Sequence, residues 1–183
     1  MAHWHEVEDL LRGCARDDVA DRGAVRPTLV AFAGARPLLL ARWRPFEPTE
    51  GHAALSELLT LTTALRGDRL AVAIGATVRL LDEPAGSTAP GARGDPPDAL
   101  VLVSVEASGG GTARRCTLTP FELERRTGGV LWGRPVRCDS VAGWLVQALA
   151  AAVHAQATEM DVGAAALRCL ALGHELRSPV TQE

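Results

Sequence analysis

The feature that most constrains the fold is a series of short apolar runs separated by turns that contain glycine or proline. Two runs flank residues 34–37, two flank Gly75-Ala76, and two more flank the glycine-rich stretch 108–111. Runs bounded in this way predict strands, and a short turn between two strands makes them antiparallel neighbours. The sequence therefore predicts a mainly antiparallel sheet of about five to seven strands.

Segments with helical periodicity lie at both ends of the chain and in its middle. The first has Val7, Leu11 and Cys14 on one face, with Glu8 and Arg12 as an i,i+4 pair on another. We expect further helices after the second strand and at the C-terminus. Helices packed on one or both faces of an antiparallel sheet form an α+β domain.

We expect residues 1–176 to form this single α+β domain, interrupted by one flexible loop. Residues 83–98 are rich in proline, glycine and alanine and have no apolar periodicity, which predicts a surface loop. Residues 177–183 are expected to be a loose C-terminal tail, and His174 and Glu175 just before them also look mobile.

The triplet Arg-Gly-Asp occurs twice, at 66–68 and at 93–95. The first copy follows the last leucine of the middle helix, where a left-handed glycine often ends a helix, so Gly67 is predicted to be that residue. The second copy falls in the predicted loop. An adhesion role would require a secreted protein, and the acidic N-terminus has no apolar signal core.

Residue types that the chain lacks exclude several kinds of catalysis. There is no lysine, so all 19 basic side chains are arginines, and there is no tyrosine. Without lysine there is no Schiff base, no phosphate loop of the Walker type and no Ser-x-x-Lys site. Without tyrosine there is no phenolic acid or base. GC-rich codon usage explains the abundance of arginine in this chain. A single arginine is therefore weak evidence for an anion site.

Charge and cysteine spacing restrict the partners and the compartment. The net charge of −3 gives no basic surface for nucleic acid or for a membrane, and the longest apolar run is too short to span a bilayer. No two cysteines are close enough for a Cys-x-x-Cys motif, so we expect no metal site, no cofactor and a cytoplasmic protein with reduced thiols. The cysteines are Cys14, Cys116, Cys138 and Cys169.

One segment has the residue types of an anion-binding site. Arg42, Trp43 and Arg44 precede His52, which lies in the first turn of the middle helix. Two guanidinium groups, an aromatic ring and a histidine near a helix N-terminus could hold an anion. The alternative is that Trp43 is a core residue and that the two arginines point to water.

The C-terminal helical region is apolar on most of its faces, which indicates burial against a partner. Its candidate interface residues are Leu145, Leu149, Val153, Leu167 and Leu170. The function hypothesis is a non-catalytic protein-interaction or regulatory module that binds a protein partner or a second copy of itself. The alternative hypothesis is a small-molecule or anion-binding protein, or an enzyme, that uses the Arg42–His52 segment. No catalytic residue is assigned.

Overall fold

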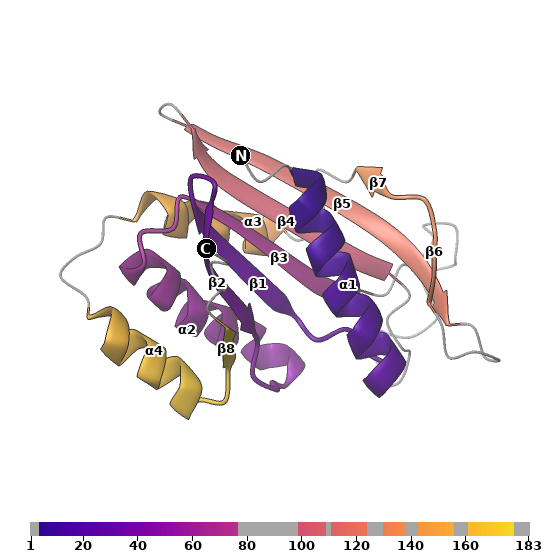
Figure 1. Ribbon diagram of the computed structural model, residues 1–183, viewed down its shortest axis with the longest axis horizontal. Helices are drawn as coiled ribbons and strands as arrows, with labels where there is room; N and C mark the ends of the chain where they lie inside the picture. Colours follow the sequence, from indigo (N-terminus) through magenta and orange to yellow (C-terminus); the bar gives the residue numbers. More distant parts are fainter. Residues whose placement is uncertain are drawn as a thin grey trace, which may run out of the picture.

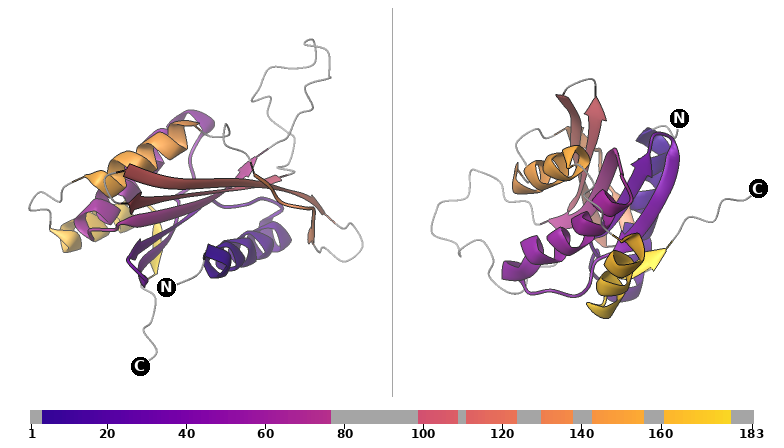
Figure 2. Two further views of the ribbon diagram at one scale, coloured as in Figure 1. Left: turned by 90° about the horizontal axis from the view of Figure 1, so that it is seen from above. Right: turned by 90° about the vertical axis from the view of Figure 1, so that its left-hand side faces the viewer.

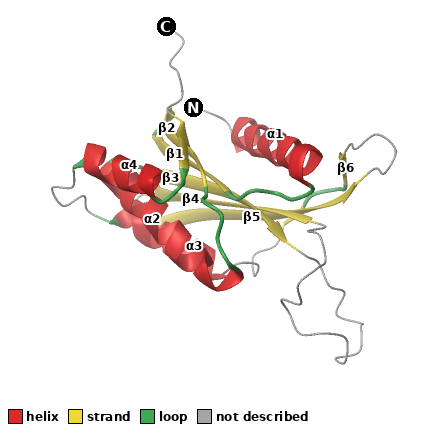
Figure 3. Ribbon diagram, turned by 90° about the horizontal axis from the view of Figure 1, so that it is seen from below, coloured by secondary structure: helices red, strands yellow, loops and turns green. Residues whose placement is uncertain are grey.

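The computed structural model describes residues 4–76, 99–108, 111–123, 130–137, 143–155 and 161–177. In this part of the chain, one antiparallel sheet lies between α1 on one face and α2, α3 and α4 on the other (Figures 1 and 3). The helices are α1 (Trp4–Arg22), the short 3-10 helix η1 (Pro48–Glu50), α2 (Gly51–Ala64), α3 (Gly143–His154) and α4 (Val162–Ala171).

The eight described strands form one sheet in the order β6-β5-β4-β3-β1-β2-β8, with β7 paired to β5. The predicted α+β class and the predicted places of the helices are confirmed. The strands are β1 (Thr28–Ala33), β2 (Arg36–Arg42), β3 (Arg69–Ala76), β4 (Ala99–Ser108), β5 (Gly111–Leu123), β6 (Val130–Trp132), β7 (Val136–Arg137) and β8 (Glu175–Arg177).

The strand at the C-terminal end was not expected. β8 pairs antiparallel with β2, with Leu176 opposite Ala41 and Arg177 opposite Leu40. Arg177, predicted to begin the loose tail, is thus the last residue of a strand, while residues 178–183 lie outside the described part of the chain.

Two of the predicted hairpins are present in the sheet. β1 and β2 are joined through Gly34-Ala35, and Gly34 has a φ of 57°, a left-handed conformation that glycine adopts without strain. β4 and β5 pair from Ser108 opposite Gly111 onward, so the glycine-rich stretch connects them.

The predicted turn at Gly75-Ala76 is wrong. Both residues continue β3, with Gly75 opposite Leu100 and Ala76 opposite Ala99 on β4. A long ladder with β4 forms many backbone hydrogen bonds, and this pairing overrides the local turn preference of one glycine. The predicted loop 83–98 lies outside the described residues.

The prediction that Gly67 is the left-handed residue ending α2 is off by one position. Arg66 has a φ of 57°, and Gly67 is not among the residues with positive φ. The amide of Arg66 donates to Thr63 O at 2.9 Å and that of Gly67 to Thr62 O at 3.0 Å. This pattern is a Schellman motif with arginine at its left-handed position.

The first Arg-Gly-Asp triplet is therefore part of the fold. The Asp68 carboxylate accepts the Gly34 N–H with both oxygens at 2.9 Å, which ties the β1–β2 turn to the start of β3. The Asp68 N–H also donates to Phe32 O at 2.9 Å.

Both sheet faces are buried, so the central strands are apolar at nearly every position. Along β4, Val101, Val103 and Val105 pack toward α2 and α3, and Leu100 and Leu102 pack toward α1. This explains the continuous apolar runs in the sequence, because side chains alternate between the two covered faces.

Candidate functional site

The predicted anion-binding residues do not converge in the structure. Arg42 forms an ion pair with Asp18 of α1, on one face of the sheet. Arg44 reaches Glu57 of α2, on the opposite side. His52 contacts the ring of Trp144 on α3, with centroids 4.2 Å apart.

Trp43 is a core residue, as the alternative interpretation proposed. It is 1% exposed, and its ring lies 5.6 Å from that of Phe46. Arg42 and Arg44 do not simply point to water, because each guanidinium group is held by a carboxylate.

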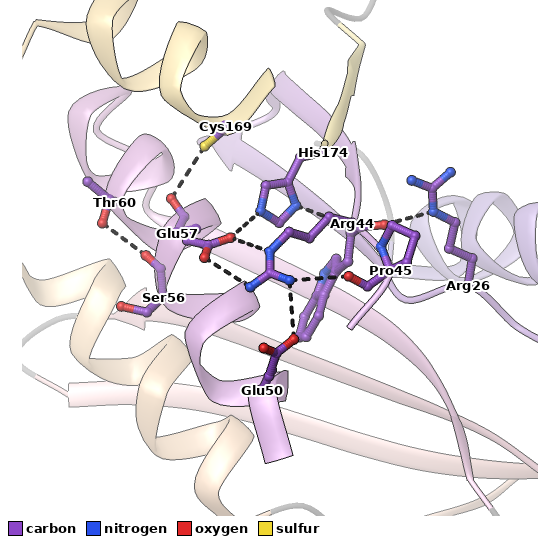
Figure 4. Close-up of polar contacts among 10 residues, drawn as sticks. Arg26, Arg44, Pro45, Glu50, Ser56, Glu57, Thr60, Cys169 and His174 are labelled. Carbon is purple, nitrogen blue, oxygen red and sulfur yellow. Dashed lines mark hydrogen bonds and ion pairs between the residues drawn. The ribbon is translucent and has the colours of Figure 1, made fainter. Parts of the chain in front are cut away.

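A polar cluster joins the segment after β2, α2 and the C-terminal segment (Figure 4). Arg44 donates from Nε to Glu57 Oε2 at 3.0 Å and from Nη2 to Oε1 at 3.2 Å, which is a two-pronged arginine–carboxylate pair. Nε2 of His174 lies 2.7 Å from Glu57 Oε2. The Arg44 backbone N–H donates to His174 Nδ1 at 3.0 Å.

These contacts define the protonation state of His174. Its Nδ1 accepts a hydrogen bond and therefore carries a lone pair, so the ring is neutral with its proton on Nε2, which donates to Glu57. The side chain is 0% exposed, and this burial lowers the pKa of His174, although Glu57 opposes the shift.

Glu57 is the ionised partner in the cluster. The hydrogen bond from Arg44 holds the pKa of the Glu57 carboxyl below its ordinary value, even though burial works in the opposite direction. Its carboxylate is already bound by Arg44 and His174, so it is placed to hold structure together rather than to accept a substrate proton.

Cys169 of α4 completes the cluster as a buried thiol. Its Sγ donates to the Glu57 carbonyl oxygen at 3.4 Å. Burial, followed by the nearby Glu57 charge, raises the pKa of Cys169. The thiol therefore stays protonated, which is unsuited to a nucleophile.

A cleft of about 270 Å³ lies beside this cluster, between α2 and α4. Small side chains on the facing sides of the two helices leave this space open. It is lined chiefly by Ala53, Ser56, Thr60, Ala165 and Arg168.

His174, expected from the sequence to lie in a mobile region, is a buried member of the polar cluster. The residue is 2% exposed and follows Gly173, whose φ of 94° ends α4 and turns the chain back toward the sheet. The available signal was the predicted helix stop at Gly173, since the residue after a left-handed glycine often packs against the helix it follows.

The candidate interface residues fall into two groups. Leu145 and Leu149 are 0% exposed and belong to the core between α3 and the sheet, and Val153 is half-buried. Leu167 and Leu170 are 68% and 50% exposed on α4.

Among the described residues, helix α4 packs mainly small side chains against the core. Cys169 is buried, and Ala165 and Ala166 are half-buried. The larger apolar side chains are exposed: besides Leu167 and Leu170, Val162 is 39% exposed, and Leu172, just after the helix, is 40% exposed. Figure 2 shows α4 at the outer edge of the helical layer, where its far side meets no described element.

No family model, curated protein or solved structure matches this chain. The described residues contain no group of three or more His, Cys, Asp or Glu side chains arranged to hold a metal ion. Among the described helices, none is both long enough and apolar enough to cross a bilayer.

Proposed function

We propose that this protein is a non-catalytic interaction module that binds another protein chain through the outer face of α4. The observation that carries the proposal is the exposure of Leu167 and Leu170, at 68% and 50%, on an ordered helix. Arg168 is the one charged residue in the sequence from Val162 to Leu172.

Exposed apolar side chains on α4 are unfavourably solvated. A helix that is apolar on nearly all its faces is normally buried, yet most of α4 lies open among the described residues. Fully burying one leucine side chain contributes roughly 1.5–3 kcal/mol. Covering two leucines and their neighbours would therefore stabilise a complex of this protein with a partner chain. Clustered exposed side chains of this kind mark interaction sites.

The face is also held in a fixed position, which reduces the entropy lost on binding. The Asp161 side chain caps the N-terminus of α4, accepting the Gly163 N–H at 2.7 Å and the Ala164 N–H at 3.3 Å. At the other end, the His174 N–H donates to Cys169 O at 3.0 Å.

The polar cluster beneath α4 supports a non-catalytic role. The Glu57 carboxylate binds Arg44 and His174, both ring nitrogens of His174 are hydrogen-bonded, and Cys169 is protonated. A general base or a nucleophile needs a free lone pair at a surface that the substrate can reach.

The simplest partner is a second copy of the chain. Two identical apolar faces satisfy each other without requiring charges to match, and symmetric dimers are the most frequent oligomers. A dimer through α4 would cover Leu167 and Leu170 of both copies at once.

Analytical ultracentrifugation at micromolar concentration tests this proposal. We expect the wild type to sediment as a dimer and the double variant L167E/L170E as a folded monomer, because both positions are exposed and tolerate charge in the monomer. The matched control is L131E, which places a charge on an equally apolar residue, 55% exposed on β6, away from α4. This variant should remain dimeric.

A wild type that is monomeric at these concentrations would contradict the dimer. If that monomer also melted at a higher temperature with an anionic metabolite, the result would favour the alternative hypothesis of a small-molecule or anion-binding protein.

A further inference from the structure

We propose that α4 and β8 form a pH-sensitive latch: protonation of His174 releases both elements from α2 and β2 and dismantles the docking face of α4. The effect on docking rests on the function proposed above. The latch itself rests on contacts that exist whether or not a partner binds.

Among the described residues, the latch segment, residues 161–177, is attached to the body of the protein through a few polar contacts and one short strand pairing. Cys169 Sγ contacts Glu57 O, and His174 joins Glu57 to the Arg44 amide. Glu175 forms an ion pair with Arg26, and the three residues of β8 pair with Leu40–Arg42 of β2. His174 lies at the centre of these attachments, between α4 and β8.

The packing around these polar contacts is light. α4 lays alanines and one cysteine against the core, and β8 adds one larger apolar side chain, the half-buried Leu176. Detachment of the latch segment would therefore expose little large apolar surface. Elements with few buried apolar contacts open at lower free energy than the whole domain unfolds. Breaking the central polar attachment can therefore release the latch segment while the sheet stays folded.

The geometry around His174 accommodates only the neutral ring. A second proton would have to sit on Nδ1, where it would face the Arg44 N–H that now donates to this atom. The His174 cation would also have no contact with water, because the side chain is 0% exposed. Both effects oppose protonation as long as the segment remains docked.

Charged groups approach His174 from each element that surrounds it. Glu57 of α2 favours the cation, but Arg44 already shares that carboxylate, and the charges of Arg44 and Arg26 oppose the cation. The other titratable groups of the cluster are Glu50 of η1, Cys169 and Arg168 of α4, and Glu175 of β8. Burial together with the two arginines outweighs Glu57, so the pKa of His174 lies below its ordinary value of 6.5.

The three cysteines in the described part of the chain report on the latch without any engineered probe. Cys169 is 2% exposed at the α2–α4 contact, Cys116 is 5% exposed in the core beside α3, and Cys14 is a half-buried residue of α1. Dithiodipyridine labels thiols also in mild acid, and peptide mass spectrometry assigns the labelling rate to each cysteine.

The rate for each cysteine is divided by its rate in the urea-unfolded chain at the same pH, because the reactive thiolate fraction itself falls with pH. We expect this relative rate of Cys169 to rise by about tenfold per pH unit as the pH falls from 6.5 toward the lowered pKa of His174, because opening takes up one proton. At every pH the relative rate of Cys169 should be higher than that of Cys116, because exposure of Cys116 requires global unfolding. Equal relative rates at Cys169 and Cys116 would show that Cys169 is reached only by global unfolding and would overturn the proposal. A relative Cys169 rate that does not depend on pH would also overturn it.

The matched variants are H174N and H174Q, which cannot take up a proton in this range. Asn can accept the Arg44 N–H in place of Nδ1, and Gln can donate to Glu57 in place of Nε2. We expect the tenfold pH response of Cys169 to disappear in both, even if the basal rate is higher. Persistence of the response in a folded variant would assign it to another group and refute the latch.

Sedimentation at the same pH values separates the latch from the proposed function. If Cys169 opens in acid but the protein is monomeric at every pH, the latch stands and the docking function fails. If the protein is a dimer at neutral pH and dissociates in acid with the opening of Cys169, both stand. A dimer that persists in acid with Cys169 open would refute the control of docking by the latch.

Discussion

The two faces of the sheet are covered in different ways. On one face, α2 and α3 pack against the sheet through an apolar contact, in which Leu55, Leu58 and Leu149 are at most 1% exposed. The polar cluster around Glu57 attaches α4 and β8 beside this contact. On the other face, α1 crosses the sheet among the described residues as a single helix, and its apolar contact is flanked by charged pairs (Figure 3).

The apolar part of the α1 contact is a narrow stripe. Its buried residues recur every fourth position: Val7, Leu11, Ala15 and Val19. The predicted i,i+4 pair is confirmed, with Arg12 Nη2 2.7 Å from Glu8 Oε1. This pair is not on a solvated face, however, because Glu8 is 9% exposed and Arg12 also approaches the Thr119 hydroxyl of β5.

Asp18 anchors the C-terminal half of α1. It pairs with Arg42 of β2 and accepts the Arg26 N–H at 3.2 Å, and its side chain is 5% exposed. Burial disfavours the charge of Arg42, but the bond to Asp18 outweighs burial and raises the pKa of the guanidinium. A single helix with a narrow stripe could slide along the sheet, and the ion pair fixes its position.

The largest effect is expected from breaking this ion pair. Asp18→Ala leaves the Arg42 guanidinium, 14% exposed, without its carboxylate and the Arg26 amide without its acceptor. Removing one partner of a buried pair should lower the free energy of unfolding by about 3–5 kcal/mol. Urea denaturation measures this loss.

The double variant D18A/R42M is the control for that result. Because it removes both charges and keeps an apolar side chain of similar length, it should be more stable than D18A alone. A double variant that is less stable by the sum of the two single effects would show that the charges do not act as a pair.

The second largest loss of stability is expected on the sheet face that α2 and α3 cover. Leu149→Ala deletes a fully buried side chain between α3 and the sheet and should lower the free energy of unfolding by about 2–5 kcal/mol. This loss should be the same at low and high salt, since no charge is involved. A strong salt dependence would contradict the view that this face is held by apolar packing.

The third prediction is a pH dependence of the free energy of unfolding that originates in the polar cluster between α2 and α4. The pKa of His174 is lowered in the folded protein, so the unfolded chain binds its proton first as the pH falls below 6.5. The free energy of unfolding should therefore decrease by about 1.4 kcal/mol per pH unit between that value and the lowered pKa of the folded protein, and His174 should contribute no slope above 6.5.

Denaturation of the wild type and of H174N between pH 7 and pH 4.5, the ordinary pKa of a glutamate, tests this expectation. H174N should lack the His174 slope. If the two proteins show the same slope in this interval, the acid sensitivity belongs to groups elsewhere, including the charged pairs beneath α1.

The smallest change in stability is expected from substitutions at the C-terminal ends of the helices. α1 and α4 are followed by the left-handed glycines Gly23 and Gly173, whereas α2 is followed by Arg66 in the same conformation. Arg66→Gly removes a left-handed side chain and should stabilise the protein by up to about 1 kcal/mol, as measured by thermal denaturation. Gly173→Ala is the mirror experiment and should destabilise by a similar amount. An unchanged melting temperature in both variants would show that these ends do not limit stability.

Local signals were sufficient for the fold class because hairpin turns and helix periods depend on neighbouring residues. The β1–β2 turn and the end of α4 at Gly173 follow from the conformational freedom of glycine. The same reasoning failed at Gly75, where pairing with β4 decided the backbone, and at Arg66, where the last turn of α2 set which residue became left-handed.

The candidate site was beyond local reasoning. Arg44, Glu57 and His174 come from three separate segments, and the sequence contains no spacing that connects position 57 with position 174. Arg42 and Arg44 are close in sequence, but they diverge to opposite sides of the sheet because each finds a carboxylate on a different helix.

The sequence by itself determined the periodicity of the elements, the places of most turns, and the absence of lysine and tyrosine chemistry, since these depend on residue type and on neighbours along the chain. Tertiary structure alone decided which apolar residues remained exposed. Leu149 and Leu167 read alike in the sequence, yet one is buried by the sheet and the other is not, because burial depends on what the fold brings against a side chain.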